Sequence, residues 1–123
     1  MFCLDEKTAL ITGASGGIGG AIAKTLHAAG ATVAISGTRV DSLQALAAEL
    51  GDRVHVLTCN LSNAEAVALL PKQAAKTMGK VDILVNNAGI TRDNLFMRMS
   101  DDEWSAVLDI NLTSTMRLCR GVL

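Results

Sequence analysis

The stretch TGASGGIG, from Thr12 to Gly19, decides the fold, because it joins an apolar run to a helical pattern. Gly13 allows a tight turn off the preceding strand, and Gly19 lets the following helix pack closely on the sheet. Gly17 lets the backbone approach a pyrophosphate, because no Cβ intervenes. The exposed N–H groups and the positive dipole at the helix start favour phosphates. The turn therefore predicts a dinucleotide-binding site.

The glycines in this turn have the spacing G-x-x-x-G-x-G, which departs from the common G-x-G-x-x-G fingerprint. The turn lies between a predicted strand and a predicted helix, which is the context that a cofactor site requires. Glycine pairs also occur in turns with a purely structural role, and the spacing alone leaves that alternative open. We predict cofactor contacts from Ser15 and Ile18 as well as from the three glycines.

Short β-branched runs alternate with longer helical patterns on both sides of the turn. Ile18, Ile22 and Leu26 recur every four residues, which marks one face of a helix. The same reasoning along the chain predicts strands at residues 8–12, 32–36, 53–58 and 81–85, and helices at 18–26, 40–50, 65–78 and from 104 to 118 or beyond.

This alternation predicts an α/β fold with a parallel sheet and helices on both faces. The predicted strands are almost continuously apolar, as in a sheet that is buried on both sides. Right-handed crossovers give the strand order 3-2-1-4, the start of a doubly wound, Rossmann-type fold. The sequence has no repeat, low-complexity stretch or linker, so residues 1–123 are predicted to form a single, incomplete dinucleotide-binding domain.

Local signals predict where the helices begin and end. Gly30 is expected to close the first helix, and Asp41 to cap the second. Ser62 and Glu65 form an S-x-x-E capping box that opens the third helix. Pro71 falls inside that helix, where it should remove a hydrogen bond and bend the axis.

Composition excludes several classes of function. The 11 basic and 12 acidic residues nearly cancel, and no basic stripe indicates a nucleic-acid partner. No apolar run approaches the roughly 18 residues of a membrane span, and the N-terminus lacks the pattern of a secretory signal. The three cysteines are widely spaced without a metal-binding pattern, so we expect free thiols in a cytoplasmic protein and no metal site.

Two further motifs accompany the glycine turn. Asn86–Gly89 reads N-N-A-G directly after the fourth predicted strand, and Asn111 lies in the last predicted helix. Together the three motifs resemble those of the short-chain dehydrogenases/reductases, from about Lys7 onward. The stretch NAGITRDNL at 87–95 more narrowly resembles the bacterial 3-oxoacyl-acyl-carrier-protein reductases, although acetoacetyl-CoA reductases and sugar dehydrogenases share much of it.

The resemblance implies cofactor contacts beyond the turn. Asn60 and Leu61, after the third predicted strand, would contact the adenine. Asn87, Ala88 and Gly89 would line the path of the cofactor toward its nicotinamide.

Two asparagines are given different roles. Asn111 lies on the apolar stripe of its helix, where an unpartnered amide would cost about 1–3 kcal/mol. The resemblance implies that it is catalytic and helps to hold a water that links the catalytic lysine to solvent. The alternative is a helix-packing asparagine bonded to backbone. Asn86 is interpreted as a structural residue that ties neighbouring backbone together.

The choice of cofactor depends on the residues about 20 positions after the turn. An acidic side chain there would bind the ribose hydroxyls of NAD, whereas arginine or a small polar group accommodates the 2′-phosphate of NADP. The sequence has Gly37, Thr38 and Arg39 and no acid at this strand end. The planar fork of Arg39 suits a phosphate, so we predict NADP(H). The alternatives are that Arg39 is only solvated, or that Gly16 weakens the preference, since many NADP-dependent relatives carry a basic residue there.

The family resemblance implies hydride transfer to a ketone, with a tyrosine as the proton donor, a lysine that lowers its pKa and a serine that orients the carbonyl. The sequence contains no tyrosine. We therefore expect the cofactor-binding half of an NADPH-dependent reductase in fatty acid biosynthesis, which is inactive alone and self-associates through its open edge. Its expected partners are an acyl thioester carried on acyl carrier protein and further copies of itself.

Two other functions stay open. The chain could be a non-catalytic nucleotide-binding or assembly module that is complete at this length. It could instead belong to a short-chain dehydrogenase that acts on a sugar, a steroid or a small alcohol.

Overall fold

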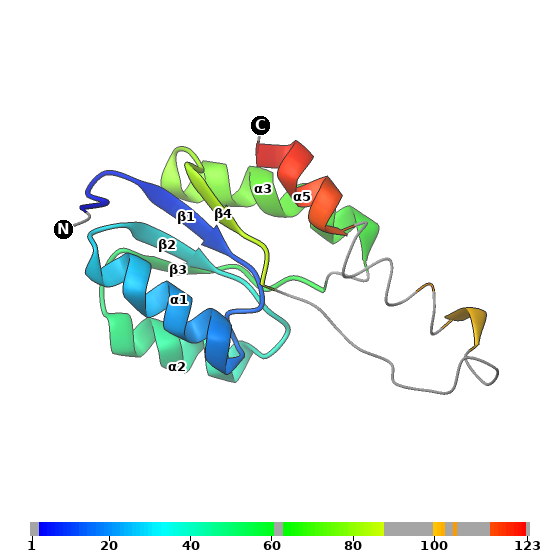
Figure 1. Ribbon diagram of the computed structural model, residues 1–123, viewed down its shortest axis with the longest axis horizontal. Coiled ribbons are helices and arrows are strands. Elements are labelled where there is room, and N and C mark those ends of the chain that lie inside the picture. The colour runs from blue at the N-terminus through cyan, green and yellow to red at the C-terminus, as the bar shows by residue number, and fades with distance from the viewer. Residues whose placement is uncertain (1–2, 61–62, 88–99, 103–104, 106–113, 123) are drawn as a thin grey trace.

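The computed structural model describes residues 3–60, 63–87, 100–102, 105 and 114–122 (Figure 1). Strands and helices alternate along the chain, as the sequence predicts. The elements are β1 (Thr8–Ile11), α1 (Gly17–Ala28), β2 (Thr32–Ile35), α2 (Val40–Leu50), β3 (Val54–Val56), α3 (Ala64–Met78), β4 (Ile83–Val85) and α5 (Ser114–Val122).

The described strands form one parallel sheet with the order β3-β2-β1-β4, which confirms the predicted doubly wound arrangement. Leu10 in β1 lies level with Ala34 in β2 and with Leu84 in β4. Each strand is shorter than predicted, because residues such as Thr12 and Ser36 already belong to the turns that leave the sheet. Within the described part of the chain, β4 has β1 as its only strand neighbour, so its outer edge is open.

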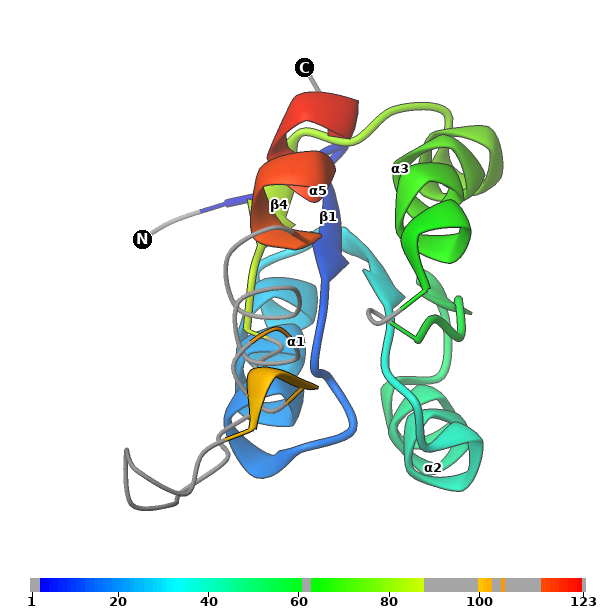
Figure 2. The same cartoon turned by 90° about the vertical axis from the view of Figure 1, so that its right-hand side faces the viewer.

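Helices cover both faces of the sheet (Figures 1 and 2). The helices α1 and α2 pack on one face over Ala9, Ile11, Val33 and Ile35, which are fully buried. The helices α3 and α5 pack on the opposite face in a second apolar cluster. That cluster consists of Leu10, Ala34, Cys59, Val67, Leu70, Ala74 and Leu118.

The helix caps differ in part from the predictions. The third helix is capped by Asn63, whose side chain accepts hydrogen bonds from Glu65 and Ala66, so the predicted Ser62 cap is wrong by one residue. Both residues are polar and adjacent, and sequence cannot show which of them has the extended backbone of a cap. In α2 the cap position is Arg39, and Asp41 lies within the first turn, so the predicted Asp41 cap is also wrong.

The first helix ends at its predicted glycine signal, because the N–H of Gly30 donates to the His27 carbonyl at 3.0 Å and that of Ala31 to the Leu26 carbonyl at 3.1 Å. The last helical residue is Ala28 and the cap residue is Ala29, while Gly30 follows with φ +109°. A Cβ at Gly30 would overlap the carboxylate of Asp5, so the absence of a side chain here is also a packing requirement. Gly30 therefore closes the helix, as predicted.

Pro71 does not end α3, which continues from Ala64 to Met78. The ring of Pro71 is buried and lies against Gly121 of α5, where an added Cβ would come within 2.6 Å of the proline Cγ. The two helices thus meet where one has a proline ring and the other has no side chain. The absence of a side chain at Gly121 therefore allows the close approach of α5 to the ring of Pro71.

Candidate functional site

The glycine-rich turn leaves β1 and enters α1 at the carboxyl edge of the sheet. Gly13 has φ +66°, in the left-handed region that glycine adopts without strain. The backbone N–H of Gly16 donates to the carbonyl of Gly13 at 3.2 Å, and the N–H of Ala14 donates to the carbonyl of Ser36 at 3.0 Å. The tight turn predicted at Gly13 is confirmed. A backbone hydrogen bond from Ala14 to Ser36 joins it to the end of β2.

The amino end of α1 is open to an anion. Gly16 occupies the cap position without a side-chain hydrogen bond, and the first helical turn contains no acidic residue. The first-turn N–H groups of an α-helix have no partner within the helix, and its dipole is positive at this end. Among the described residues, no side chain caps these groups. Ile18 lies beside them and is 73% exposed.

Gly17 and Gly19, at the start of α1, have opposite surroundings. A Cβ on Gly19 would overlap the carbonyl oxygen of Gly13 and lie 2.8 Å from the amide nitrogen of Asn87. Gly19 therefore permits close packing, as predicted. At Gly17 an added Cβ would have no described atom within 4 Å. The backbone of Gly17 is thus bare toward solvent, and the turn fits a diphosphate that approaches this surface.

The end of β4 is bonded to the glycine turn through Asn87. Its side-chain amide donates to the carbonyl of Gly13 at 3.2 Å, and its backbone N–H donates to the hydroxyl of Thr12 at 3.2 Å. Asn86 is exposed, and its amide donates to the sulfur of Cys119 at 3.4 Å. Among the described residues, Asn87 rather than Asn86 therefore ties the neighbouring backbone together, and the expected contact of Asn87 with the cofactor stays a prediction.

Gly37 brings the end of β2 to the glycine turn. A Cβ on Gly37 would lie 2.8 Å from the hydroxyl oxygen of Ser15, so a side chain here would displace that hydroxyl. The carbonyl of Gly37 accepts the backbone N–H of Cys59 at 3.2 Å. The predicted site residues Ser15 and Gly37 therefore lie close together, and Gly37 is hydrogen-bonded to the segment that follows β3.

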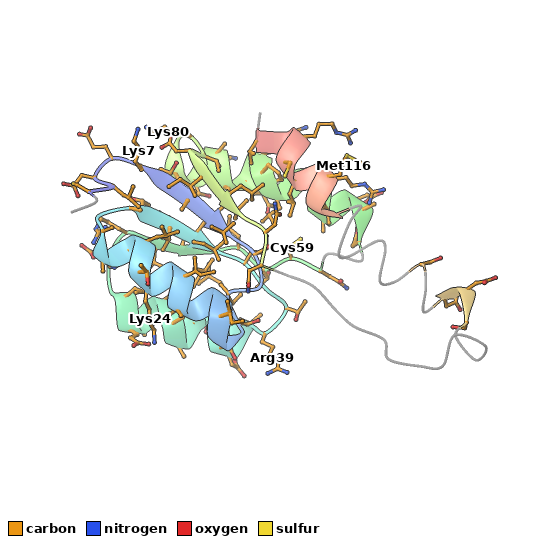
Figure 3. The ribbon with its side chains drawn as sticks, viewed as in Figure 1. Lys7, Lys24, Arg39, Cys59, Lys80 and Met116 are labelled. Carbon is orange, nitrogen blue, oxygen red and sulfur yellow. The ribbon has the colours of Figure 1, made fainter. Side chains whose placement is uncertain are left out.

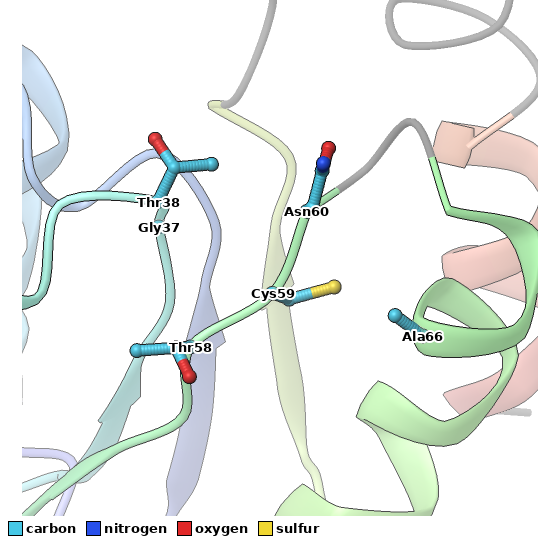
Figure 4. A pocket seen from close by; sticks show the side chains of 6 residues that line it. All are labelled: Gly37, Thr38, Thr58, Cys59, Asn60 and Ala66. Carbon is cyan, nitrogen blue, oxygen red and sulfur yellow. The ribbon is translucent and has the colours of Figure 1, made fainter.

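A hollow of about 370 Å³ opens beside this contact (Figure 4). The predicted residues Gly37, Thr38 and Asn60 line it, so the structure groups the residues that were assigned to the adenosine part of a dinucleotide. Sequence analysis missed three other lining residues, since none belongs to a motif. These residues are Thr58, Cys59 and Ala66.

Cys59 forms part of the hollow wall and is only 7% exposed. Burial raises the pKa of its thiol, because a thiolate would lose solvation there. At neutral pH the side chain is therefore a neutral thiol and presents an apolar surface. Such a surface suits a planar base better than a charged group.

Arg39 lies at the start of α2 and is exposed (Figure 3). It forms no ion pair with any residue that the structure describes. Thr38, its neighbour, lines the hollow. The guanidinium is therefore available to a ligand phosphate at the outer end of the site.

Several predicted site residues lie outside the described part of the chain. They are Leu61, Ala88, Gly89 and the proposed catalytic residue Asn111. Over the described residues, no group of three or more side chains could hold a metal ion. In the same part of the chain, no helix combines the length and apolar character needed to cross a membrane.

The glycine turn, the hollow and Asn87 all lie at the carboxyl ends of parallel strands. In open doubly wound sheets, ligands bind at this edge, where the strand order reverses. In this sheet the order reverses between β1 and β4, beside the uncapped end of α1. The fold and the site together define a dinucleotide-binding protein of the Rossmann type.

A family model for short chain dehydrogenases matches residues 7–123. The chain therefore belongs to the short-chain dehydrogenase family, whose members are oxidoreductases that bind nicotinamide cofactors. The predicted family is confirmed.

Sequence relatives align with nearly all of this chain. Nodulation protein G of Rhizobium sp. (strain N33) is 58% identical over 120 residues, which are 98% of this chain and 49% of that protein. The 3-oxoacyl-[acyl-carrier-protein] reductase FabG of Escherichia coli (strain K12) is 46% identical over 119 residues, 97% of this chain and 49% of that protein. The chain spans about half the length of the curated relatives it matches.

Solved structures show the same fold. A short-chain dehydrogenase/reductase from Brucella melitensis, a glucose/ribitol dehydrogenase, superposes with a TM-score of 0.92 at 35% identity. The match covers 98% of this chain and 52% of the Brucella chain. A short chain dehydrogenase from Mycobacterium smegmatis gives a TM-score of 0.91 at 36% identity.

Proposed function

We propose that this chain is the cofactor-binding half of an NADPH-dependent reductase that acts on 3-oxoacyl thioesters. The observation that carries the proposal is the uncapped amino end of α1, where Gly17 leaves the backbone bare for a diphosphate. When bound, the cofactor supplies a hydride. The residues of this chain bind it, orient it and hold its charged groups.

Different parts of the site would bind different groups of the cofactor. The first-turn amides of α1 and the hydroxyl of Ser15 would hold the diphosphate. The hollow beside Gly37 and Asn60 would hold the adenosine, with the neutral thiol of Cys59 against the base. Asn87 would keep the turn in place through its bond to the Gly13 carbonyl.

The preference for NADPH over NADH rests on Arg39. No acidic side chain stands at the end of β2, where one would bind the free ribose hydroxyls of NAD. Arg39 is exposed next to Thr38 and can form a two-pronged contact with a 2′-phosphate. This arrangement supports NADPH as the cofactor.

The thioester substrate is supported by the relatives. The E. coli relative is a 3-oxoacyl-[acyl-carrier-protein] reductase at 46% identity. A sugar or polyol is the second candidate substrate, favoured by the glucose/ribitol dehydrogenase among the solved structures, at 35% identity. The higher identity favours the thioester. In either reaction the proton donor would come from outside these 123 residues, because the chain has no tyrosine.

Calorimetric titration tests the cofactor assignment. We expect NADPH to bind more tightly than NADH, and Arg39→Ala to remove most of that difference. Arg120→Ala, at an exposed arginine on the opposite face of the sheet, is a control for the loss of one arginine outside the site. Equal affinity for the two cofactors in the parent chain would overturn the assignment. An assay with acetoacetyl thioester should give no turnover by the chain alone, and clear turnover would contradict the absence of a proton donor.

A further inference from the structure

The hollow at the ends of β2 and β3 is large enough for one part of a dinucleotide. Its volume of about 370 Å³ lies at the lower end of the range for small-molecule sites, which is about 300–1,000 Å³. It extends from Gly37, beside the glycine turn, to Ala66 in α3 (Figure 4). The proposed function places the adenosine of the cofactor here, so the walls of the hollow would decide which purine base can bind.

The hollow is polar but carries no charge of its own. Among the residues that the structure describes, six line it, and none of their side chains is charged at neutral pH. Arg39 follows Thr38 in the sequence and Glu65 precedes Ala66, but neither charged residue is part of the lining. Such a site suits a neutral polar group, such as a base, better than a phosphate or a carboxylate.

Each polar side chain of this lining can both donate and accept a hydrogen bond. The hydroxyls of Thr38 and Thr58 can rotate to do either. The amide of Asn60 has a donor and an acceptor, which a turn of the side chain exchanges. The neutral thiol of Cys59 is a weak donor and a weak acceptor. The described lining therefore has no side chain that only accepts, as a carboxylate does, or that only donates, as a lysine does.

Part of the backbone around the hollow is already hydrogen-bonded within the chain. The N–H of Cys59 donates to the carbonyl of Gly37 at 3.2 Å. The carbonyl of Asn60 accepts from the N–H of Asn63 at 2.9 Å, and the N–H of Ala66 donates to the Asn63 side chain at 3.2 Å. These backbone groups have a fixed role and are used within the protein. Recognition of a base therefore falls mainly to the side chains, which can change role.

Adenine and hypoxanthine differ in the hydrogen bonds that one edge of the base can form. Adenine has a donor, its 6-amino group, beside the acceptor N1. Hypoxanthine has an acceptor, its 6-oxo group, beside the donor N1–H. A site discriminates strongly between two such ligands when the wrong one leaves a buried polar group of the site unpaired. Side chains that can exchange donor and acceptor avoid this cost with either base.

We propose that the hollow accepts a 6-oxopurine as readily as adenine, so that the chain also binds nicotinamide hypoxanthine dinucleotide phosphate, the hypoxanthine analogue of NADPH. This inference rests on the proposed function, because it concerns the base of the same cofactor. Asn60 determines the specificity in this arrangement. It is exposed after β3, and its amide can offer the edge of the base either an oxygen or an NH₂ group.

Calorimetric titrations with reduced NADPH and with its reduced hypoxanthine analogue test the inference. We expect the two dissociation constants of the parent chain to agree within about threefold, because either edge finds partners. Asn60→Asp introduces a group that only accepts, so it should favour the 6-amino base by at least about tenfold. The matched control is Gln44→Glu, which adds the same charge at an exposed position of α2 and should leave the ratio of the two affinities unchanged.

The ratio of the two affinities separates recognition of the base from a general effect of charge. A new carboxylate repels the phosphates of both cofactors alike. Repulsion alone would therefore lower both affinities and leave their ratio unchanged. Thr58→Asp places a second carboxylate at the lining of the hollow, and it should shift the ratio in the same direction if Asn60→Asp does not fold.

The outcomes distinguish this inference from the proposed function. Affinities within threefold in the parent chain, with a shifted ratio in a carboxylate variant, support the inference. A larger preference for NADPH in the parent chain would overturn it and leave the proposed function intact. An unchanged ratio in both carboxylate variants would also overturn it, because the base would then not contact the hollow. Failure of the parent chain to bind either cofactor would defeat the proposed function.

Discussion

The side-chain amide of Asn87 donates a hydrogen bond of 3.2 Å to the backbone carbonyl of Gly13, across 74 positions of sequence. The backbone N–H of Asn87 donates to the hydroxyl of Thr12 at the same distance. The end of β4 therefore holds the turn that leaves β1. This relationship makes the geometry of the glycine-rich turn dependent on a residue that follows the neighbouring strand.

Replacing Asn87 tests that dependence. Asn87→Ala would leave the Gly13 carbonyl without its side-chain donor, so we expect a loss of about 1–2 kcal/mol in the free energy of unfolding and weaker NADPH binding. Urea denaturation and calorimetry would measure the two effects. Asn86→Ala is the control, because that side chain is exposed and its one hydrogen bond within the described part of the chain goes to the Cys119 sulfur. Equal losses in the two variants would contradict the role given to Asn87.

Gly19 and Gly20 give a matched pair of substitutions in one helix. A Cβ on Gly19 would overlap the Gly13 carbonyl, whereas a Cβ on Gly20 would meet only the Ala14 carbonyl oxygen at 3.6 Å. We expect Gly19→Ala to lower the free energy of unfolding by about 1–3 kcal/mol, as overpacking does. Gly20→Ala should raise it by up to about 1 kcal/mol through helix propensity. Thermal denaturation of both variants would measure the difference, and a stable Gly19→Ala protein would contradict the packing.

Much of the fold follows from local sequence patterns. The apolar run at residues 8–12 predicts a strand, and the four-residue spacing of Ile18, Ile22 and Leu26 predicts a helix. The structure contains both, as β1 and α1. The sequence predicts that Gly13 allows a tight turn off β1, and its φ of +66° agrees. Such signals act within a few residues of one another, so sequence alone is sufficient to locate them.

Contacts between distant segments were harder to predict. Asn86 and Asn87 are chemically identical, and only the direction of each side chain after β4 decides which one reaches the turn. Cys59 lies in the hollow because the ends of β2 and β3 are adjacent, and the position of one cysteine in the sequence does not reveal this. The cap at Asn63 depended on backbone angles that the neighbouring polar residue could also have adopted.

Acid should weaken the junction between β1 and β4 at Asp82. The backbone N–H of Thr8 donates to its carboxylate at 3.0 Å, and this bond, supported by Lys80 at 3.2 Å, lowers the pKa of Asp82. The carboxylate thus stabilises the folded chain fully above its ordinary pKa of 3.8, and that contribution is lost as the pH falls through the lower folded value. Urea denaturation between pH 6 and the acid limit would measure the loss. Asp82→Asn should show a shallower fall in the free energy of unfolding, and an unchanged slope would contradict the assignment.

Gly17→Ala should separate binding from stability. An added methyl group would meet no described atom within 4 Å, so we expect the melting temperature to stay within about 2 °C of the parent value. The same methyl group would lie where a diphosphate approaches the backbone, so NADPH affinity should fall at least about tenfold. Calorimetry and thermal denaturation on one sample would measure both. Full NADPH affinity in this variant would mean that the ligand does not approach Gly17.

Gly16→Arg should strengthen the preference for NADPH. Gly16 has φ −92° and ψ 169°, which any residue adopts, and an added Cβ would lie 3.6 Å from the nearest described atom, the Gly13 carbonyl oxygen. The turn can therefore accept an arginine side chain. We expect its charge to lie at the same end of the candidate site as Arg39. A second charge-assisted contact with the 2′-phosphate should raise the ratio of NADPH to NADH affinity by about tenfold. Gly16→Gln, with a similar length and no charge, should leave the ratio nearly unchanged. If the arginine and glutamine variants gave equal ratios in calorimetric titrations, the 2′-phosphate would not bind beside this turn.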